Sequence, residues 1–346
     1  MTSEKAAGAG DGRTDSLPFD ISVAHQARMY NYVLGGKDNY AADRAAVEAG
    51  LKAWPDMAFS MRANRAFLGR VVRYLAGQAG MRQFLDIGTG IPTAGNTHEI
   101  AQAIAPEARV VYVDYDPIVL AHARALLNSH EAGATEYIDA DLRDTPAILS
   151  QAGQLLDFTQ PVAVTLVAIL HAIPDADDPH AIVAAVMDAV PPGSYLALSH
   201  SASDLFDQQT KDSFRSVVDR MVQQQYTPRS REQVARFFAG TDLMEPGLVP
   251  VEEWRPEPGT FDTRKSALWG AVGRKNFVVG QPLPRHRPTM ARLTSNGLRS
   301  MWRRVMACRR RAPRPGGRGF PRCAARWSVV RGWRRGRRPG ATRRCR

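Results

Sequence analysis

Acidic and glycine residues follow three consecutive apolar runs of the sequence, and together they could hold a nucleoside. Asp86-Ile87-Gly88-Thr89-Gly90 closes the first run, Asp114 ends the second, and Asp141 with Leu142 follows the third. Glycine lets the backbone approach a ligand closely because it has no Cβ atom. A carboxylate can accept hydrogen bonds from the two hydroxyls of a ribose, and Leu142 could pack against a purine. These positions predict a nucleoside site with Asp114 at the ribose.

Motifs that are missing narrow the choice of nucleoside. The dinucleotide motif needs a third glycine, and Thr93 stands in its place after Pro92. The chain also lacks the Gly-x-x-x-x-Gly-Lys-Ser/Thr motif that binds a triphosphate. Asp86 would repel a phosphate, but its charge suits the cationic amino and sulfonium groups of S-adenosylmethionine. The alternative is that these acids are only helix caps and solvated loop residues.

Five strands separated by helices must position these residues. The apolar runs predict strands at 84–87, 110–114, 136–138, 162–170 and 195–199. Helical spacing predicts helices at 97–105, 117–127, 146–152 and 180–189. This alternation is typical of an α/β fold with a doubly wound, mostly parallel sheet and right-handed crossovers. Ligands in such sheets bind beyond the carboxyl ends of the strands.

The remaining segments frame this domain, which we place at residues 80–275. Residues 1–18 are expected to be disordered, and residues 19–79 are helical, with Trp54 in a packing role. Residues 204–240 are polar and helical, and residues 248–254 and 267–272 predict two closing strands. Capping boxes are expected at Asn96 with Glu99 and at Ser230 with Gln233.

Several segments resemble the actinobacterial S-adenosylmethionine-dependent methyltransferase family long catalogued as a domain of unknown function. The resemblance runs from about Phe19 to Lys275. It is carried by Ala27-Arg28-Met29-Tyr30-Asn31-Tyr32-Val33-Leu34-Gly35-Gly36-Lys37-Asp38-Asn39-Tyr40, Asn64-Arg65-Ala66-Phe67-Leu68, Asp86-Ile87-Gly88-Thr89-Gly90, Val113-Asp114-Tyr115-Asp116-Pro117, Ala140-Asp141-Leu142-Arg143-Asp144 and Val167-Ala168-Ile169-Leu170-His171-Ala172-Ile173-Pro174-Asp175. Two positions depart from the pattern, because Asn is usual at Tyr115 and an aromatic residue at Ala172.

The resemblance implies a class I methyltransferase fold. This fold is a Rossmann-like, seven-stranded, mostly parallel sheet with helices on both faces, and residues 19–79 would form an N-terminal helical lid. The resemblance also implies roles for single residues. Asp86, Gly88 and Gly90 would shape the pocket for the methionine end, Asp114 would hold the ribose, Asp141 and Leu142 would flank the adenine, Arg28, Tyr30 and Gly36 would cover the cofactor, and His171 would face the reacting methyl group.

Methyl transfer is an in-line displacement, so positioning alone can supply much of the rate. A general base is needed only if the acceptor must lose a proton. His171 is the first candidate, since the pKa of histidine lies near neutrality, and His200 is the second. His171 could equally be a core histidine with a satisfied hydrogen bond. Ser199 and His200 are neighbours on a strand and point to opposite faces, which argues against a hydrolytic pair.

Charge and cysteine divide the chain near Lys275. Residues 276–346 contain 21 of the 46 basic residues, none of the 34 acidic residues and all 3 cysteines, which leaves residues 1–275 with a net charge of −9. The body therefore lacks a disulfide framework and a cysteine nucleophile. The tail is expected to be disordered. It is either an arm that binds nucleic-acid phosphates or an out-of-frame product of a GC-rich gene, since it has many arginines and no lysine.

The leading hypothesis is a cytoplasmic, bacterial methyltransferase that acts on a small molecule in specialised metabolism. The N-terminus lacks an apolar signal segment, and the longest apolar run, 162–173, is shorter than the roughly 20 residues that span a bilayer. We therefore expect no membrane partner. Two alternatives stay open: a regulator that binds S-adenosylmethionine without turning it over, and a nucleic-acid methyltransferase guided by the basic tail.

Overall fold

The computed structural model describes residues 20–126, 129–222, 225–259 and 262–276. The chain divides into two units, Met1–Gln281 and Pro282–Arg346, and every described residue belongs to the first. The expectations for residues 1–18 and, Asn276 apart, for the Arg-rich tail lie outside the described residues. Within the described ranges, no helix is both long enough and apolar enough to cross a membrane.

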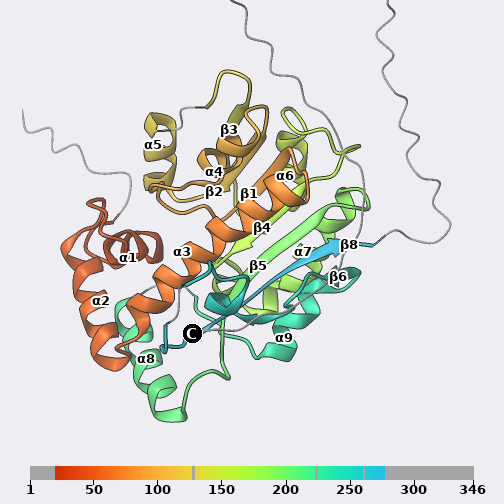
Figure 1. Cartoon of the computed structure of the whole chain (residues 1–346). Coiled ribbons are helices and arrows are strands. Elements are labelled where there is room, and N and C mark those ends of the chain that lie inside the picture. The colour runs from red at the N-terminus through yellow and green to blue at the C-terminus, as the bar shows by residue number, and fades with distance from the viewer. Residues whose placement is uncertain (1–19, 127–128, 223–224, 260–261, 277–346) are drawn as a thin grey trace, which may run out of the picture. The chain divides into compact units, whose positions relative to one another are not determined.

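A mixed sheet forms the centre of the first unit (Figure 1). Strands β3, β2, β1, β4 and β5 are parallel in that spatial order, and β8 pairs antiparallel with β5. Strand β6 continues the path beside β8, and the short β7 also pairs with β8. The predicted α/β class, with a mostly parallel sheet and an antiparallel closing strand, is confirmed. The strands are β1 (Gln83–Ile87), β2 (Arg109–Asp114), β3 (Ala134–Asp139), β4 (Ala163–Val167), β5 (Tyr195–Ser201), β6 (Thr241–Leu243), β7 (Val249–Pro250) and β8 (Leu268–Lys275).

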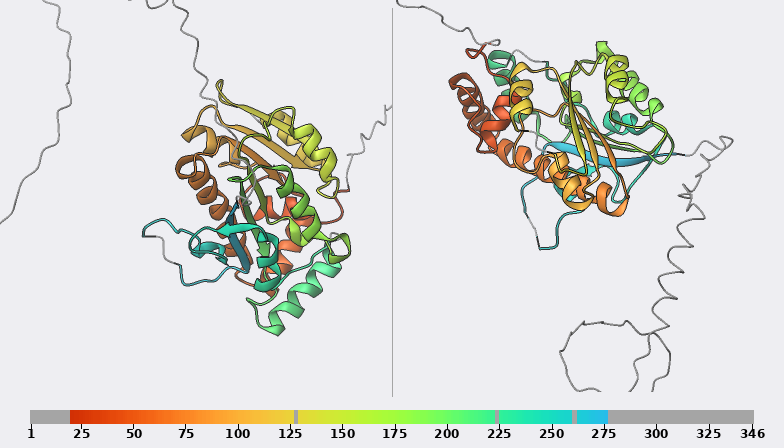
Figure 2. Two further views of the ribbon diagram at one scale, coloured as in Figure 1. Left: turned by 90° about the vertical axis from the view of Figure 1, so that its right-hand side faces the viewer. Right: turned by 90° about the horizontal axis from the view of Figure 1, so that it is seen from above.

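Helices cover both faces of this sheet (Figure 2). One buried cluster joins the sheet to α6, α7 and the turn after α9, and a second joins the opposite face to α3 and α4. The predicted capping boxes form at Asn96 with Glu99 and at Ser230 with Gln233. These helices are α3 (Met57–Arg73), α4 (Thr97–Ile104), α5 (Pro117–Leu126), α6 (Thr145–Ala152), α7 (Pro179–Ala189), α8 (Gln208–Met221) and α9 (Arg231–Ala235).

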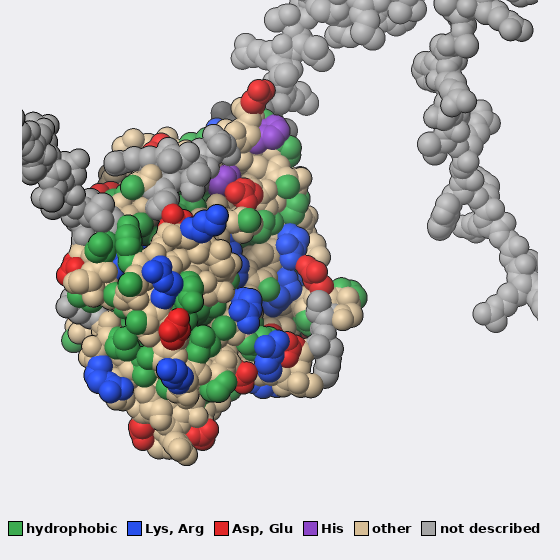
Figure 3. Space-filling view, turned by 90° about the vertical axis from the view of Figure 1, so that its left-hand side faces the viewer, with side chains coloured by type: hydrophobic (Ala, Val, Ile, Leu, Met, Phe, Trp, Pro, Cys, Tyr) green, Lys and Arg blue, Asp and Glu red, His purple; other side chains and the backbone are tan. Residues whose placement is uncertain are grey.

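The N-terminal region folds into α1 (Gln26–Val33) and α2 (Ala41–Ala53), followed by α3. Helix α2 lies along α8, although more than 150 residues separate them in the chain, and side chains from α1, α2, α3 and α8 share one apolar cluster. On the face in Figure 3, Lys and Arg side chains lie scattered among acidic and hydrophobic ones. These helices stand beside the sheet edge where the strands of the predicted nucleoside site end (Figure 1).

Two predicted strands are wrong in extent. The run at 162–170 leaves the sheet after Val167, because Ala168 adopts a positive φ of 57° and a 3-10 turn over Leu170–Ala172 follows. The run at 248–254 gives only the two-residue β7, and then the chain turns over Val251–Glu253. Val251 and Trp254 are fully buried against α3, so their apolar character serves the core between helix and sheet.

Candidate active site

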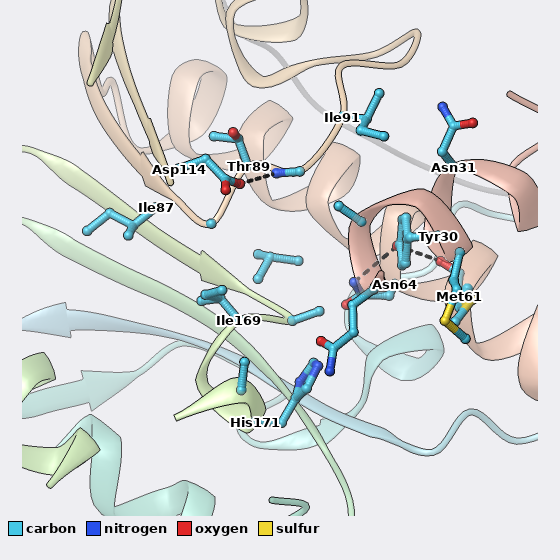
Figure 4. A pocket seen from close by; sticks show the side chains of 18 of the residues that line it. Tyr30, Asn31, Met61, Asn64, Ile87, Thr89, Ile91, Asp114, Ile169 and His171 are labelled. Atoms are coloured by element: carbon cyan, nitrogen blue, oxygen red, sulfur yellow. Dashed lines mark hydrogen bonds between the residues drawn. The ribbon is translucent and has the colours of Figure 1, made fainter. Parts of the chain in front are cut away.

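A single cavity at the carboxyl ends of β1 to β4 brings together most of the predicted site residues. Its lining includes Tyr30, Asp86, Gly88, Gly90, Asp114, Asp141, Leu142 and His171. The lining does not include Arg28, Gly36 or His200. Figure 4 shows Thr89 and Asp114 at one end of this cavity, with Met61, Asn64 and His171 toward the other.

The glycine loop after β1 needs glycine for two different reasons. Gly88 has a φ of +78°, and a Cβ atom there would lie 2.5 Å from Cγ1 of Ile169. Gly90 also has a positive φ, of +64°, but a Cβ atom would meet nothing within 4 Å. Glycine is therefore required at position 88 by packing as well as by backbone conformation. The space beside Gly90, in contrast, is open for a ligand.

Asp114 is held in place by backbone donors around its carboxylate. Oδ2 accepts from the Gly90 N–H at 2.8 Å, and Oδ1 accepts from the N–H groups of Tyr115 at 2.9 Å and Asp116 at 3.1 Å. Burial raises the pKa of Asp114, and these donors oppose that shift. The bond from Gly90 ties the end of β2 to the glycine loop, so both move as one unit.

Asp86 is buried beneath the loop, with both carboxylate oxygens hydrogen-bonded. The Thr97 hydroxyl donates to Oδ2 at 2.6 Å, and the Thr165 hydroxyl donates to Oδ1 at 2.7 Å. Burial raises the pKa of Asp86, against the two hydroxyl donors. Because Asp86 has no cationic partner among these bonds, its negative charge is available to a cationic ligand group in the cavity.

Asp141 follows β3 and binds the side chain of Arg143. Oδ2 accepts from Nη2 of Arg143 at 2.6 Å, Oδ1 accepts from its Nε at 2.9 Å, and Arg143 also reaches Asp177. The side-chain bonds from Arg143 lower the pKa of Asp141. Leu142 is buried in the core cluster on one face of the sheet. Asp141 thus lies in the cavity wall as an ionised carboxylate that Arg143 holds in place.

A chain of hydrogen bonds joins the N-terminal helices to the sheet. The Tyr30 hydroxyl donates to the Met61 carbonyl at 2.8 Å and accepts from Asn64 Nδ2 at 3.2 Å. Asn64 Oδ1 accepts from the Ser199 hydroxyl at 2.6 Å, and that hydroxyl accepts from the Ala168 N–H at 3.0 Å. Burial raises the pKa of Tyr30 to about 12, so its proton stays in this chain.

Arg28 and Gly36 lie outside the cavity lining and hold the neighbouring N-terminal segments in place. Arg28 is buried, and its Nε donates to Asp43 Oδ1 at 2.9 Å while its Nη2 donates to the Val23 carbonyl. A Cβ atom at Gly36 would lie 2.3 Å from Nδ2 of Asn31. Asn31 in turn accepts the Asp38 N–H at 3.0 Å. Both residues fix the fold of α1 and its following loop, and a direct contact with the cofactor stays a prediction.

His171 lies on the 3-10 turn after β4 and faces the cavity. Its side chain is almost fully buried, and its Nδ1 has no hydrogen-bond partner among the described residues. Burial, aided by the charge of Arg229, lowers the pKa of His171 to about 4. The hydrogen bond expected for a core histidine is absent at Nδ1 among the described residues, and the role of His171 stays a prediction.

His200 lies outside the cavity and is tied to Arg229. Its Nδ1 lies 2.8 Å from the Ser201 carbonyl, and its Nε2 lies 2.9 Å from Nη1 of Arg229. Burial lowers the pKa of His200 to about 3. Ser199 faces Asn64 on the opposite side of β5, as the alternation of strand side chains predicts.

Arg229 was not predicted, and it holds the turn that carries His171. It is fully buried, and it donates to the carbonyls of Leu170 and Ile173 at 2.9 Å each and to Asp175 at 2.6 Å. The polar segment around Arg229 gives no sign of this burial. Asn64 stands within a segment that carries the family resemblance, which is the only signal that could have found it.

The wall opposite the glycine loop is apolar and aromatic. Trp54, expected to pack in the core, lines the cavity and meets Phe214 of α8 with ring centroids 5.5 Å apart. Phe214 meets Tyr226 at 5.8 Å, and Tyr226 meets His171 at 5.5 Å. These rings come from distant segments, so sequence spacing alone could not group them.

Residues 13–276 match the family described as S-adenosyl methyltransferase. The chain belongs to this family. It is 44% identical to a DUF574 family protein from Streptomyces avermitilis, with a TM-score of 0.71 over 74% of this chain and 99% of that one. It is 39% identical to a candidate methyltransferase from Thermobifida fusca, with a TM-score of 0.68 over 75% of this chain and 97% of that one. No curated protein matches.

Membership confirms the family resemblance, the class I fold and S-adenosylmethionine as the cofactor. The methyltransferase site fits that cofactor in two respects. Gly90 leaves open space where a ligand backbone or sugar could approach, and the buried Asp86 carboxylate lacks a cationic partner in its hydrogen-bonding shell. The contacts of single residues with the cofactor stay predictions.

Proposed function

We propose that this methyltransferase methylates a small molecule enclosed in the cavity, with His171 as the general base. The observation that carries the proposal is the His171 imidazole, which is buried, faces the cavity and has no partner for Nδ1 among the described residues. An unpaired polar atom in a buried site is costly unless a ligand completes it. In the proposal, Nδ1 of His171 therefore accepts the proton that the methyl acceptor loses.

The cofactor would lie across the glycine loop. In the proposal, the Asp114 carboxylate accepts from the ribose hydroxyls, and Asp141 with Leu142 flanks the adenine. Asp86 lies beneath the methionine end, where its charge offsets that of the amino and sulfonium groups. When bound, S-adenosylmethionine supplies an electrophilic methyl group on a positively charged sulfur.

The transfer balances as a displacement at that methyl group. The acceptor oxygen forms the new bond to carbon, the carbon–sulfur bond breaks, and its electron pair stays on sulfur in S-adenosylhomocysteine. The acceptor proton goes to the His171 imidazole. A buried imidazolium is normally unfavourable, but the positive charge of the sulfonium disappears in the same step. The net charge of the cavity therefore stays constant during the transfer. For this reason His171 can accept the proton although its pKa is low.

The enclosed site favours a small acceptor over nucleic acid. Helices α1 and α3 and the aromatic wall close one side of the cavity. Positive charge does not gather on the face in Figure 3, where acids and bases are mixed, and nucleic-acid sites usually show a basic patch. The Arg-rich tail, Asn276 apart, lies outside the described residues.

Calorimetric titration with S-adenosylmethionine tests the cofactor site, with a matched pair of acid variants. Asp114→Ala should lower the affinity by roughly 1.5–3 kcal/mol, the scale of hydrogen bonds to a charged group. Asp139→Ala removes an exposed acid at the end of the neighbouring strand, outside the cavity, and should change nothing. Equal affinities for both variants would show that Asp114 does not hold the ribose.

Turnover is tested by incubating the protein with methyl-labelled cofactor and fractionated metabolite extract. Transfer should yield S-adenosylhomocysteine and a labelled small molecule, and His171→Gln should lose most of the rate while keeping cofactor affinity. Binding without any product would favour the regulator. Product formation that resists the His171 change would remove the base from the mechanism.

A further inference from the structure

The cavity has two ends of opposite character. The charged side chains of acids and arginines in its lining are Arg65, Asp86, Asp114, Asp141 and Arg143. Four of them belong to strand ends or the segments directly after them, and Arg65 donates to the carbonyls of Thr93 and Ala94 beyond the glycine loop. All of these groups therefore lie at the end assigned to the cofactor.

The other end, which we name the acceptor chamber, is lined by Trp54, Met57, Met61, Phe214, Val218 and Tyr226. These side chains come from α3, α8 and the segments beside them, and they belong to one apolar cluster, separate from the two clusters of the sheet. Ring contacts run without a gap from His171 through Tyr226 and Phe214 to Trp54. The chamber thus begins at the proposed base and leads away from the cofactor.

The polar groups around this chamber are almost all engaged within the protein. The Tyr30 hydroxyl and both ends of the Asn64 amide take part in the chain to Ser199. The Ser60 hydroxyl accepts the Ala267 N–H at 3.0 Å. His171 is different, because its imidazole has a buried nitrogen without a partner among the described residues. A hydroxyl on a bound molecule can therefore pair with this nitrogen, while the six named side chains of the chamber offer mainly apolar and aromatic surface.

We propose, resting on the methyltransferase function above, that the acceptor is a neutral, largely apolar ring compound that presents one hydroxyl group to His171. An ionic acceptor would lose its hydration without gaining a partner in the chamber, which costs several kcal/mol. A cationic acceptor would also meet the sulfonium charge. Aromatic edges and methionine side chains instead suit a planar ring, since both adapt to its faces and rim.

Binding to the full chain saturated with S-adenosylhomocysteine tests this class without turnover. The probes are 2-naphthol and 2-naphthoate, which share a ring system and differ in charge. We expect 2-naphthol to bind at least about tenfold more tightly, because an unpaired charge in an apolar site costs more than 1.4 kcal/mol. Equal or tighter binding of 2-naphthoate would overturn the proposal, as would no binding of 2-naphthol.

The two proposals fail in different ways. If S-adenosylhomocysteine itself does not bind, the proposed function is wrong. If it binds and 2-naphthol does not, only the acceptor class is wrong. Protein fold is checked independently by circular dichroism, so that a folded protein without affinity for S-adenosylhomocysteine contradicts the proposed function.

A pair of variants on α3 locates the probe. Met61→Gln keeps the side-chain length and the carbonyl that Tyr30 uses, but adds an amide to the chamber. It should weaken 2-naphthol about fivefold or more, the cost of an imperfectly paired buried amide, and leave S-adenosylhomocysteine unaffected. Arg62→Gln, at an exposed position beside it, should change neither. If Met61→Gln lowered the affinity for S-adenosylhomocysteine but not for 2-naphthol, this region would belong to the cofactor site.

Discussion

In the proposed mechanism His171 meets two demands that usually conflict, since it would stay buried and still accept a proton. Its pKa of about 4 reflects burial first and the charge of Arg229 second. In the unfolded chain an exposed histidine has a pKa near 6.5. Between these values the unfolded chain binds a proton that the folded protein does not, so stability falls as the pH falls through this window.

His171→Gln should therefore weaken the dependence of stability on pH. Between about pH 7 and about pH 5, the wild type should lose roughly 2 kcal/mol more than the variant, since 1.4 kcal/mol corresponds to one pKa unit. Urea unfolding at both pH values measures the difference. Equal losses would mean that the imidazole is protonated in the folded protein.

Substitutions at the two glycines of the loop should separate packing from ligand approach. Gly88→Ala places a Cβ atom against Ile169 at a positive φ and should cost roughly 2–4 kcal/mol of folding free energy. Gly90→Ala meets no atom and should cost about 1 kcal/mol of stability, but lower the affinity for S-adenosylmethionine. Thermal unfolding and cofactor titration measure the two effects. The reverse order of stabilities would contradict the structure.

The strand-end acids could be predicted from the sequence because their positions follow from local patterns. An apolar run ended by Asp or Gly places its polar residue at the sheet edge, whatever the rest of the chain does. Arg229 and Asn64 could not be assigned roles in this way. The partners of the Arg229 side chain lie 29 to 59 residues away and those of the Asn64 side chain lie 34 to 135 residues away, and only the folded chain brings them together.

At the scale of elements, the N-terminal helices are joined to the turn that carries His171 by the chain of hydrogen bonds from Tyr30 to Ala168. This chain connects α1, α3, β5 and the residue where β4 leaves the sheet. The positive φ of Ala168 places the turn to His171, and the Ser199 hydroxyl holds the Ala168 N–H. The predicted strand over 162–170 is too long for this reason, since no residue type in that run marks the turn.

Ser199→Ala should break this connection. It leaves Asn64 Oδ1 without its donor, whereas the Ala168 N–H keeps the Ser199 backbone carbonyl at 3.1 Å. One buried orphan costs about 1–3 kcal/mol, so we expect a loss of roughly 1–3 kcal/mol in unfolding free energy, measured by urea titration, together with slower turnover. Ser213→Ala, at an exposed position on α8, is the control. If Ser199→Ala were as stable as this control, the chain of hydrogen bonds would not contribute to the free energy of unfolding.

At the scale of the whole molecule, the described residues that line the cavity run from His25 to Leu268. These residues belong to the first unit, Met1–Gln281. The formal charge of +12 for the entire chain describes neither part, since the body that holds the site is acidic and its acids at 86, 114 and 141 lie in the cavity wall.

Removal of residues 282–346 should leave the affinity for S-adenosylmethionine and the midpoint of urea unfolding unchanged. The physical reason is that the described lining of the cavity, from His25 to Leu268, belongs to Met1–Gln281. Calorimetry and circular dichroism on the shortened chain make the comparison. A clear loss of cofactor affinity would assign the tail a part in the site.

The position of β8 has a consequence for synthesis of the chain. This strand is the last to be made, yet it lies between β5 and β6 and covers all seven residues of β5. At about 5–20 residues per second, residues 201 to 275 take roughly 4–15 seconds to appear. During that time β5 exposes an unpaired edge that invites pairing with other chains. A ribosome that stalls in this interval would release an aggregation-prone fragment, so uninterrupted translation through codon 275 protects the protein.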